Sequence, residues 1–289
     1  MKDIGEQLEM IFDQEYDLGS MGKIIHSKRY RVRTIKSGNV IELELYPLWD
    51  CKNEFREIRS HATRAAQDRL NRNNSIKKCI RLANCNFVNN GSLHVTLTYD
   101  PDLRLPDEVQ AKRDVKNYLT RCTRFIRKNN PRAKLKYIYV TEHYSGDGRR
   151  TRVHHHIILN GIDRDNAERL WLYGTVNADR IKSDDDSIEG LVRYILKSPS
   201  SKNEKKWVSS RGLTKPRITT ADTKISKRQV DAICEEIDEH PQIFTRWHKN
   251  HVVDDCTVRT SEYVSGAYIY AKLLPQRKAN KRIAERRRC

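Results

Sequence analysis

Long apolar stretches are missing from this 289-residue sequence, and their absence argues against a membrane-spanning helix. No run reaches the 18 consecutive apolar residues that would suggest a span. The start, Met1 to Glu6, does not have the pattern of a secretory signal peptide. We therefore expect a cytoplasmic protein with no membrane partner.

Cysteine and nucleotide-binding motifs are missing as well. The seven cysteines are odd in number and none forms a Cys-x-x-Cys pair, which argues against a disulfide framework and against a zinc knuckle. No Gly-x-x-x-x-Gly-Lys-Ser/Thr loop occurs, so the chain carries no signature of an ATP-driven helicase. Reduced thiols are the simplest expectation.

Acidic residues are too few to balance the basic ones. Lys and Arg number 56 and Asp and Glu 38, so the net charge is 56 − 38 = +18. Such an excess favours a polyanionic partner, most simply nucleic acid. Phosphate contacts would then supply much of the affinity and make it dependent on salt.

The run Arg152 to Leu159, with three consecutive histidines before apolar residues, is the most informative segment. In a strand, side chains alternate between faces, so His154 and His156 would share one face and His155 the other. Their Cα atoms would lie roughly 6.6 Å apart, close enough for both imidazoles to bind one metal ion. A surface pair or a buried, hydrogen-bonded pair explains the same letters.

A carboxylate precedes this segment on another strand-like run, Tyr137 to Glu142. Asp147-Gly148 lies between the two runs and is a strong hairpin signal. A two-residue turn there would place Glu142 opposite Val153. A loop one residue longer would place Glu142 opposite His154, on the same face, although Glu142 could also be a solvated strand residue.

A tyrosine stands on a helical pattern further along, at residues 187–197. Ile188, Leu191, Val192 and Ile195 form an apolar stripe, and Tyr194 falls away from its centre. Lys197 lies one turn on and is a neighbour of Tyr194. The pair suits a nucleophile with a cationic helper, and it also suits a tyrosine that only packs at the edge of the stripe.

Taken in order, these segments resemble the three motifs of HUH endonucleases, the rolling-circle replication initiators of plasmids and single-stranded DNA phages. The first would be His94 to Asp100, the second Arg152 to Leu159 and the third Tyr194 to Lys197. The Asn84-Cys85-Asn86-Phe87 lead-in and the segment Trp207 to Pro216 also look like parts of the bacterial and phage branch. His155 departs from the usual apolar middle position of the second motif.

The resemblance implies a metal-assisted nickase and ligase that acts on single-stranded DNA at a replication origin in a bacterial cytoplasm. Mg²⁺ or Mn²⁺ would be held by Glu142, His154 and His156, although these ligand types also suit Zn²⁺. Tyr194 would become a 5′-phosphotyrosine and leave a free 3′-OH, with help from Lys197, because free tyrosine has a pKa of about 10. The expected DNA contacts are Arg152, Arg193, Arg211, Lys215, Thr96 and Thr98.

The partners follow from the same resemblance. A host helicase and a host polymerase are expected, and oligomers are possible. The positions four residues from Tyr194 are Gly190 and Ser198, so a single nucleophile is implied. The second cleavage would then need another subunit or another group.

For the fold we expect an α+β protein with an antiparallel, ferredoxin-like or RRM-like sheet covered by helices on one face. Residues 1–53 would be an N-terminal appendage with a hairpin at Ser37-Gly38-Asn39, and 54–200 the endonuclease core. Residues 201–274 would be a basic, loop-like and then helical extension that contacts DNA, and 275–289 a basic, disordered tail.

Three alternatives stay open. A relaxase or transposase would share the chemistry, although relaxases usually place the tyrosine before the histidines. A regulator that binds single-stranded nucleic acid would carry the histidine pair incidentally. A non-enzymatic virion or plasmid protein would use the metal site structurally.

Overall fold

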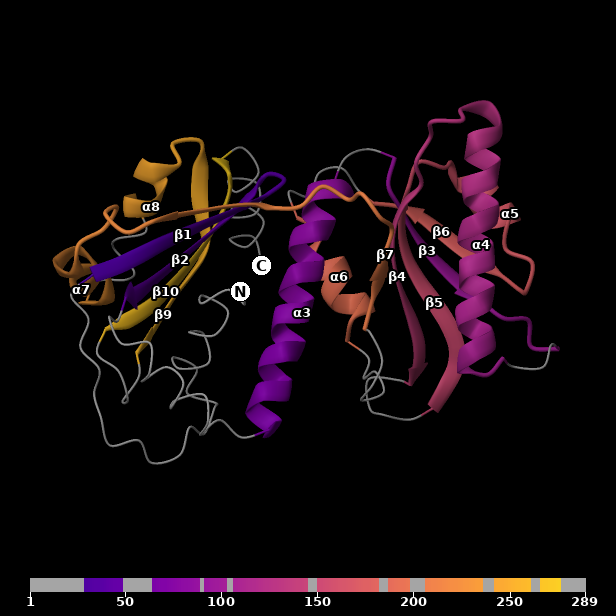
Figure 1. Ribbon diagram of the computed structural model, residues 1–289, viewed down its shortest axis with the longest axis horizontal. Coiled ribbons are helices and arrows are strands. Elements are labelled where there is room, and N and C mark those ends of the chain that lie inside the picture. Colours follow the sequence, from indigo (N-terminus) through magenta and orange to yellow (C-terminus); the bar gives the residue numbers. More distant parts are fainter. Residues whose placement is uncertain are drawn as a thin grey trace, which may run out of the picture. The chain divides into compact units, whose positions relative to one another are not determined.

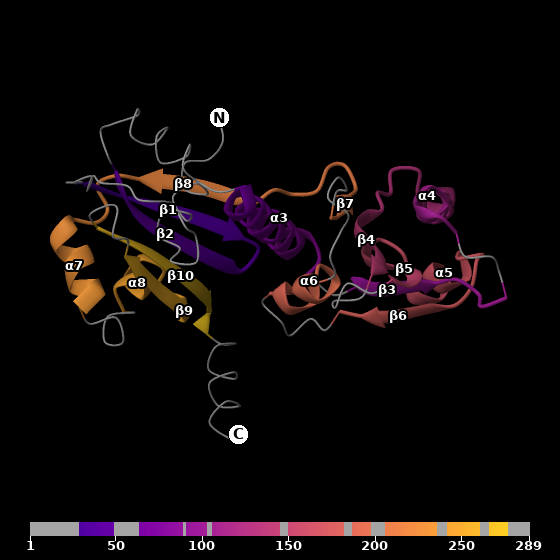
Figure 2. The same cartoon turned by 90° about the horizontal axis from the view of Figure 1, so that it is seen from below.

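The computed structural model describes residues 29–48, 64–88, 91–102, 106–144, 150–181, 187–197, 206–235, 242–260 and 266–276. The chain divides into two compact units, one formed by residues 76–215 and the other by residues 1–75 together with 216–289. Within the described residues, the strands form two five-stranded sheets (Figures 1 and 2). The expected tail from 277 onward and the Asp147-Gly148 turn lie outside the described residues.

The sheet of residues 76–215 has the strand order β6-β3-β5-β4-β7, and all its described pairings are antiparallel. Its strands are β3 (Leu93–Thr98), β4 (Lys136–Tyr144), β5 (Arg150–Asn160), β6 (Val176–Arg180) and β7 (Val208–Ser209). The central strands β3 and β5 alternate buried apolar side chains with polar ones, as expected for half-covered strands.

The register of the β4–β5 hairpin decides where the acidic side chain lies. Glu142 is opposite His154 and Val140 is opposite His156, which is the register of the longer loop. The pairing shifts between Glu142 and Tyr144, where an irregularity of the bulge type interrupts the ladder. The prediction that Glu142 and His154 share a face is therefore confirmed.

Helices pack on both faces of this sheet (Figure 1). The helices α4 (Glu108–Asn129) and α5 (Arg164–Arg169) cover one face, in a core with Val95, Leu97 and Ile157. The helices α3 (Arg64–Asn86) and α6 (Glu189–Ile195) share a second core with Ile138 and Ile158 on the other face. The predicted α+β class with an antiparallel sheet is confirmed, with these additional helices on the second face.

The other unit contains the sheet β8-β1-β2-β10-β9. Its elements are β1 (Arg29–Ser37), β2 (Val40–Leu48), β8 (Arg217–Ala221), α7 (Lys227–Glu235), α8 (Gln242–Trp247), β9 (His251–Thr260) and β10 (Ala267–Pro275). The predicted β1–β2 hairpin is confirmed, since Ser37 pairs with Val40 around a two-residue turn that begins at Gly38, whose φ is +62°. Apolar side chains of α7 and α8, among them Val230 and Phe244, pack on one face of the sheet.

The expectation of a loop-like chain after residue 200 was wrong in part, because β7 to β10 lie there. All of β8 except Ala221 is exposed, so its sequence lacks the alternation of a half-buried strand. It is ordered by pairing with β1, a partner more than 180 residues earlier in the chain. The N-terminal hairpin and the C-terminal strands thus share one sheet, a pairing that the sequence analysis did not foresee. Among the described residues, no helix has the length and apolar character needed to cross a membrane.

Candidate metal and tyrosine site

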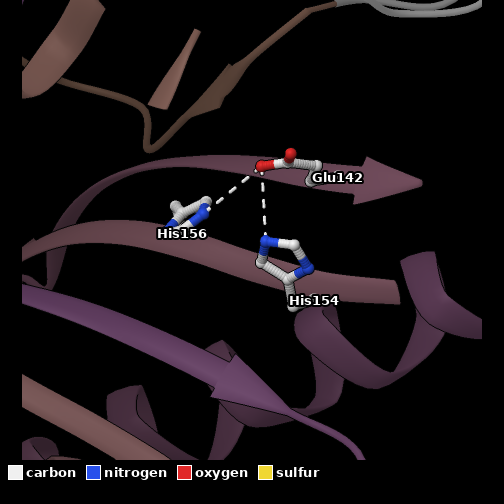
Figure 3. A group of neighbouring side chains, drawn as sticks. All are labelled: Glu142, His154 and His156. Carbon is white, nitrogen blue, oxygen red and sulfur yellow. Dashed lines mark ion pairs between the residues drawn. The ribbon is translucent and has the colours of Figure 1, made fainter. Parts of the chain in front are cut away.

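Three side chains from β4 and β5 converge on one point of the sheet (Figure 3). Nε2 of His154 lies 3.3 Å, and Nε2 of His156 3.4 Å, from the same carboxylate oxygen of Glu142. One ligand atom from each residue lies within 4.8 Å of the others. Two imidazoles and a carboxylate form a donor set that divalent metals use, so the group could hold a metal ion.

The other ring nitrogen of each histidine contacts a group that fixes the ring. Nδ1 of His154 lies 2.9 Å from the carbonyl oxygen of Arg152, and Nδ1 of His156 lies 3.3 Å from the hydroxyl of Thr96. A carbonyl oxygen only accepts, so Nδ1 of His154 carries the proton and Nε2 of the neutral ring presents a lone pair. Metal-binding histidines are oriented by hydrogen bonds of this kind.

This tautomer fits a cation between the side chains. In neutral His154 the lone pair of Nε2 faces the carboxylate oxygen of Glu142, and two lone pairs at this distance repel unless a proton or a metal ion lies between them. Glu142 and His156 are each less than 10% exposed, and His154 is 24% exposed. The site is therefore partly open, as a metal that also binds substrate requires.

Burial keeps His156 neutral. Its pKa is lowered to about 4, first by loss of solvation and then by repulsion from His154 and His94, while Glu142 acts in the opposite direction. A neutral imidazole is the form that binds metals. The donor set is thus available at neutral pH without prior loss of a proton from His156.

His155 lies on the opposite face, as the alternation predicts, and is completely buried. Its Nε2 lies 3.1 Å from the hydroxyl of Tyr99, and its Nδ1 lies 2.9 Å from the hydroxyl of Thr141. Burial lowers the pKa of His155 to about 3, with smaller contributions from the neighbouring histidines. His155 is therefore a neutral core residue and not a ligand of this site.

Tyr194 projects from α6 next to the histidines and is half exposed. Its ring centroid lies 5.7 Å from that of His156, with the two rings nearly perpendicular. The Lys197 ammonium lies 4.6 Å from the Tyr194 ring centroid. The expected helix at 187–197 is shorter, at Glu189–Ile195, and its buried residues Val192 and Ile195 face away from Tyr194 into the core.

His94 belongs to this site, although the sequence analysis gave it no role. Its ring stacks on that of His156, with centroids 5.6 Å apart and planes 20° apart, and it meets the Tyr194 ring edge-on at 6.5 Å. Its buried Nε2 has no hydrogen-bond partner in the described structure. The available signal was alternation, since His94 and Thr96 are two apart on β3 and lie on the face that carries His156.

The two threonines expected to contact DNA are both hydrogen-bonded within the protein. Thr96 contacts His156, and Thr98 donates to the carbonyl oxygen of Thr175 at 3.1 Å. Thr96 is thereby placed to orient a histidine of the site. A direct DNA contact by either threonine stays a prediction.

The four basic candidates are exposed but differ in their partners. Arg152 donates to the carbonyl oxygen of Asp100 at 3.0 Å, and Arg193 pairs with Glu189 one helical turn away at 2.7 Å. Arg211 and Lys215 lie in the segment that follows β7, at the β4 edge of the sheet. Arg152 is thus fixed beside the metal-site strand, whereas Arg211 and Lys215 lie on another edge.

Comparison with known proteins gives one match, to a family model. Residues 92–199 match the family described as Replication-associated protein ORF2. No curated protein and no solved structure matches the chain significantly. The matched segment contains Glu142, His154, His156, Tyr194 and Lys197, so the part of the chain that forms the site is similar to a family of replication-associated proteins.

Proposed function

We propose that this protein starts rolling-circle replication by nicking single-stranded origin DNA with Tyr194 and later rejoins the strand. The observation that carries the proposal is the position of Tyr194, whose ring lies 5.7 Å from that of a histidine in a ready-made metal-binding group. The similarity of residues 92–199 to replication-associated proteins supports the biological setting. The net charge of +18 suits a DNA substrate.

Glu142, His154 and His156 would hold the metal, Mg²⁺ or Mn²⁺. When bound, it would act as a Lewis acid on a non-bridging oxygen of the scissile phosphate. The Thr96 hydroxyl and the Arg152 carbonyl oxygen keep the two imidazoles in the orientation this requires. The neutral state of His156 means that it donates a lone pair and not a proton.

Tyr194 would supply the nucleophile. Its phenolic oxygen, after loss of the proton, forms a bond to phosphorus, while the bond from phosphorus to the 3′ oxygen breaks and that oxygen leaves as a 3′-OH after taking up a proton. The Lys197 ammonium, 4.6 Å from the ring centroid, favours the phenolate and the charge that develops on the phosphate. Reversal of the step, with the 3′-OH of a finished strand as nucleophile, would close a circle.

A covalent-adduct assay tests this proposal. The protein is incubated with Mn²⁺ and labelled single-stranded oligonucleotides tiled across its own replicon, and adducts are separated on denaturing gels. Wild type should give a metal-dependent adduct that Tyr194→Phe and His156→Ala abolish. Tyr137→Phe is the matched control, because Tyr137 packs in the core on the opposite face of the sheet.

The alternatives give different outcomes. DNA binding without metal and without an adduct on any oligonucleotide would overturn the nickase and favour the binding regulator. An adduct that persists in Tyr194→Phe would keep the chemistry and reject the assigned nucleophile. A relaxase or transposase would form the adduct on a transfer origin or an element end instead of a replication origin.

A further inference from the structure

The helix that carries Tyr194 is too short to fix its own position. The helix α6 has seven residues, and isolated helices below roughly 12 residues are marginal in water. Its N-cap residue is Ile188, whose side chain cannot accept a hydrogen bond from the first turn, and no side-chain cap is formed by this residue. Something outside α6 must therefore satisfy the backbone N–H groups at its start.

That group comes from α3, about 100 residues earlier in the chain. Oδ1 of Asn84 accepts a hydrogen bond from the backbone N–H of Ile188 at 3.0 Å and lies 3.3 Å from the hydroxyl of Ser187. The Ser187 oxygen in turn accepts from the backbone N–H of Glu189 at 3.2 Å. Asn84 and Ser187 thus cap the helix together, one directly and one as a relay.

The cap is buried, so water does not easily replace it. Asn84 is 4% exposed and Ser187 is 8% exposed. The remaining contacts between the two helices are apolar and involve Ala83 of α3 and Val192 of α6 within one core cluster. Apolar contacts are non-directional and permit small rotations and shifts, whereas a hydrogen bond to a side-chain amide fixes one position.

We propose that Asn84 is a positioning residue for Tyr194. By holding the first turn of α6, it sets the rotation and height of the helix, so that the tyrosine hydroxyl at the other end stands at the metal-binding group. Tyr194 lies six residues after Ile188, roughly 9 Å along the helix axis at 1.5 Å per residue. A small change at the cap is therefore carried along a rigid lever to the nucleophile. The inference rests on the proposed function.

The test measures single-turnover adduct formation at saturating DNA and Mn²⁺ in the full-length protein. Asn84→Ala should lower the rate by about 10- to 100-fold, because a misplacement of about 1 Å can cost roughly 10²-fold. The Kd for DNA and the affinity for Mn²⁺ should stay within about twofold of wild type. Asn84→Asp keeps the acceptor oxygen at a helix N-terminus, where an anion is favoured, and should restore the rate to within about threefold.

Tyr118→Phe is the matched control for lost stability. It removes a buried hydrogen bond of 2.9 Å from Tyr118 to the carbonyl oxygen of Ala167 on the opposite face of the same sheet. It should lower the Tm to a similar extent and leave the rate unchanged. A wild-type rate in Asn84→Ala would overturn the inference, and so would a rate that falls only in proportion to the Tm in all three variants.

Two further measurements keep the result decisive. If Asn84→Ala does not fold, Ser187→Ala removes only the relay and should slow the reaction by about threefold, and no slowing would overturn the inference. Wild type and Tyr194→Phe are measured in parallel. Absence of an adduct in wild type rejects the proposed function itself, whereas a tyrosine-dependent adduct with a normal rate in Asn84→Ala rejects only the role of Asn84.

Discussion

The two five-stranded sheets both place charged and polar residues opposite each other on neighbouring strands, but the pairs differ in kind. In the sheet of β1 and β2, Arg33 is opposite Glu44 and donates to it at 2.5 Å, so a permanent cation meets a carboxylate. In the sheet of β4 and β5, Glu142 is opposite His154, and an imidazole lone pair meets the carboxylate.

This difference separates a structural pair from a candidate site. The Arg33–Glu44 pair neutralises its own charge, and both side chains are at most 4% exposed. The pairs of Glu142 with the two histidines become favourable when a proton or metal ion is added, and His154 is open to solvent. Cross-strand polar pairs on a sheet therefore indicate function when their members need a ligand to be satisfied. Substitutions in either sheet can break this contrast.

The largest effect is expected from Glu142→Gln. The amide removes the only charged ligand of the three, and loss of metal-assisted charge stabilisation should slow adduct formation by roughly 10⁴-fold, about 5.4 kcal/mol at 1.36 kcal/mol per tenfold. Mn²⁺ binding, followed by calorimetry, should weaken in parallel. Glu168→Gln, in the exposed pair with Arg164 on α5, is the control and should change neither quantity. Unchanged Mn²⁺ affinity in Glu142→Gln would refute the metal site.

This site was predictable because its residues obey local rules. Strand alternation placed His154 and His156 on one face and His155 on the other, and the turn signal joined β4 to β5. The choice between two registers could not be made from the sequence, because it depends on the length of the loop. The irregularity after Glu142 has no signature of its own in the residues.

The parts that sequence reasoning missed depend on contacts between distant segments. The strand β8 pairs with β1 across more than 180 residues, and its exposed residues show no alternation. Asn84 caps a helix about 100 residues later, and the Asn-x-Asn pattern was noted only as a resemblance. Asn86 likewise holds the segment after β7, since it accepts from the backbone N–H of Thr214 at 3.0 Å. Such partners become visible only in the folded chain.

The next effect concerns the buried pair of the other sheet. Arg33→Met should lower the free energy of unfolding of its unit by about 3–5 kcal/mol, because Glu44 is left buried without its cation. The double variant Arg33→Met with Glu44→Leu should recover most of that loss. Denaturant titration followed by circular dichroism measures both.

Arg31→Met is the matched control for that pair. Arg31 lies on the same strand as Arg33 and forms a salt bridge with Asp222, but both side chains of this bridge are more than a quarter exposed. An exposed pair contributes at most about 1 kcal/mol. Equal losses in Arg31→Met and Arg33→Met would show that burial of the Arg33–Glu44 pair has no special weight.

A smaller effect is expected from Thr96→Val. The substitution removes the hydroxyl that contacts Nδ1 of His156 at 3.3 Å, so the ring is less firmly oriented toward the site. Loss of an outer hydrogen bond of this kind typically costs about 10- to 100-fold in metal affinity. Thr123→Val, which removes a hydroxyl bonded within α4, is the control. If both variants bind Mn²⁺ equally well, Thr96 does not orient His156.

The smallest effect concerns pH and the unit without the candidate site. The pKa of His248 is lowered by burial and then by the nearby Lys224, His251 and Lys36. Because the pKa of the folded state lies below the unfolded value of about 6.5, the unfolded chain binds a proton first as the pH falls. The stability from neutral His248 is therefore present above about pH 6.5 and is lost as the pH falls below it.

His248→Gln should flatten this dependence between about pH 7 and pH 5, by a few tenths of a kcal/mol for a partly exposed group. Lys224→Gln should act in the same direction, because it removes a positive charge near the imidazole. Thermal unfolding at several pH values measures the slope. An unchanged slope in both variants would show that His248 titrates as it does in the unfolded chain. The pH dependence of this sheet would then come from other groups, and its contrast with the histidine site, where burial also holds His156 neutral, would rest on geometry alone.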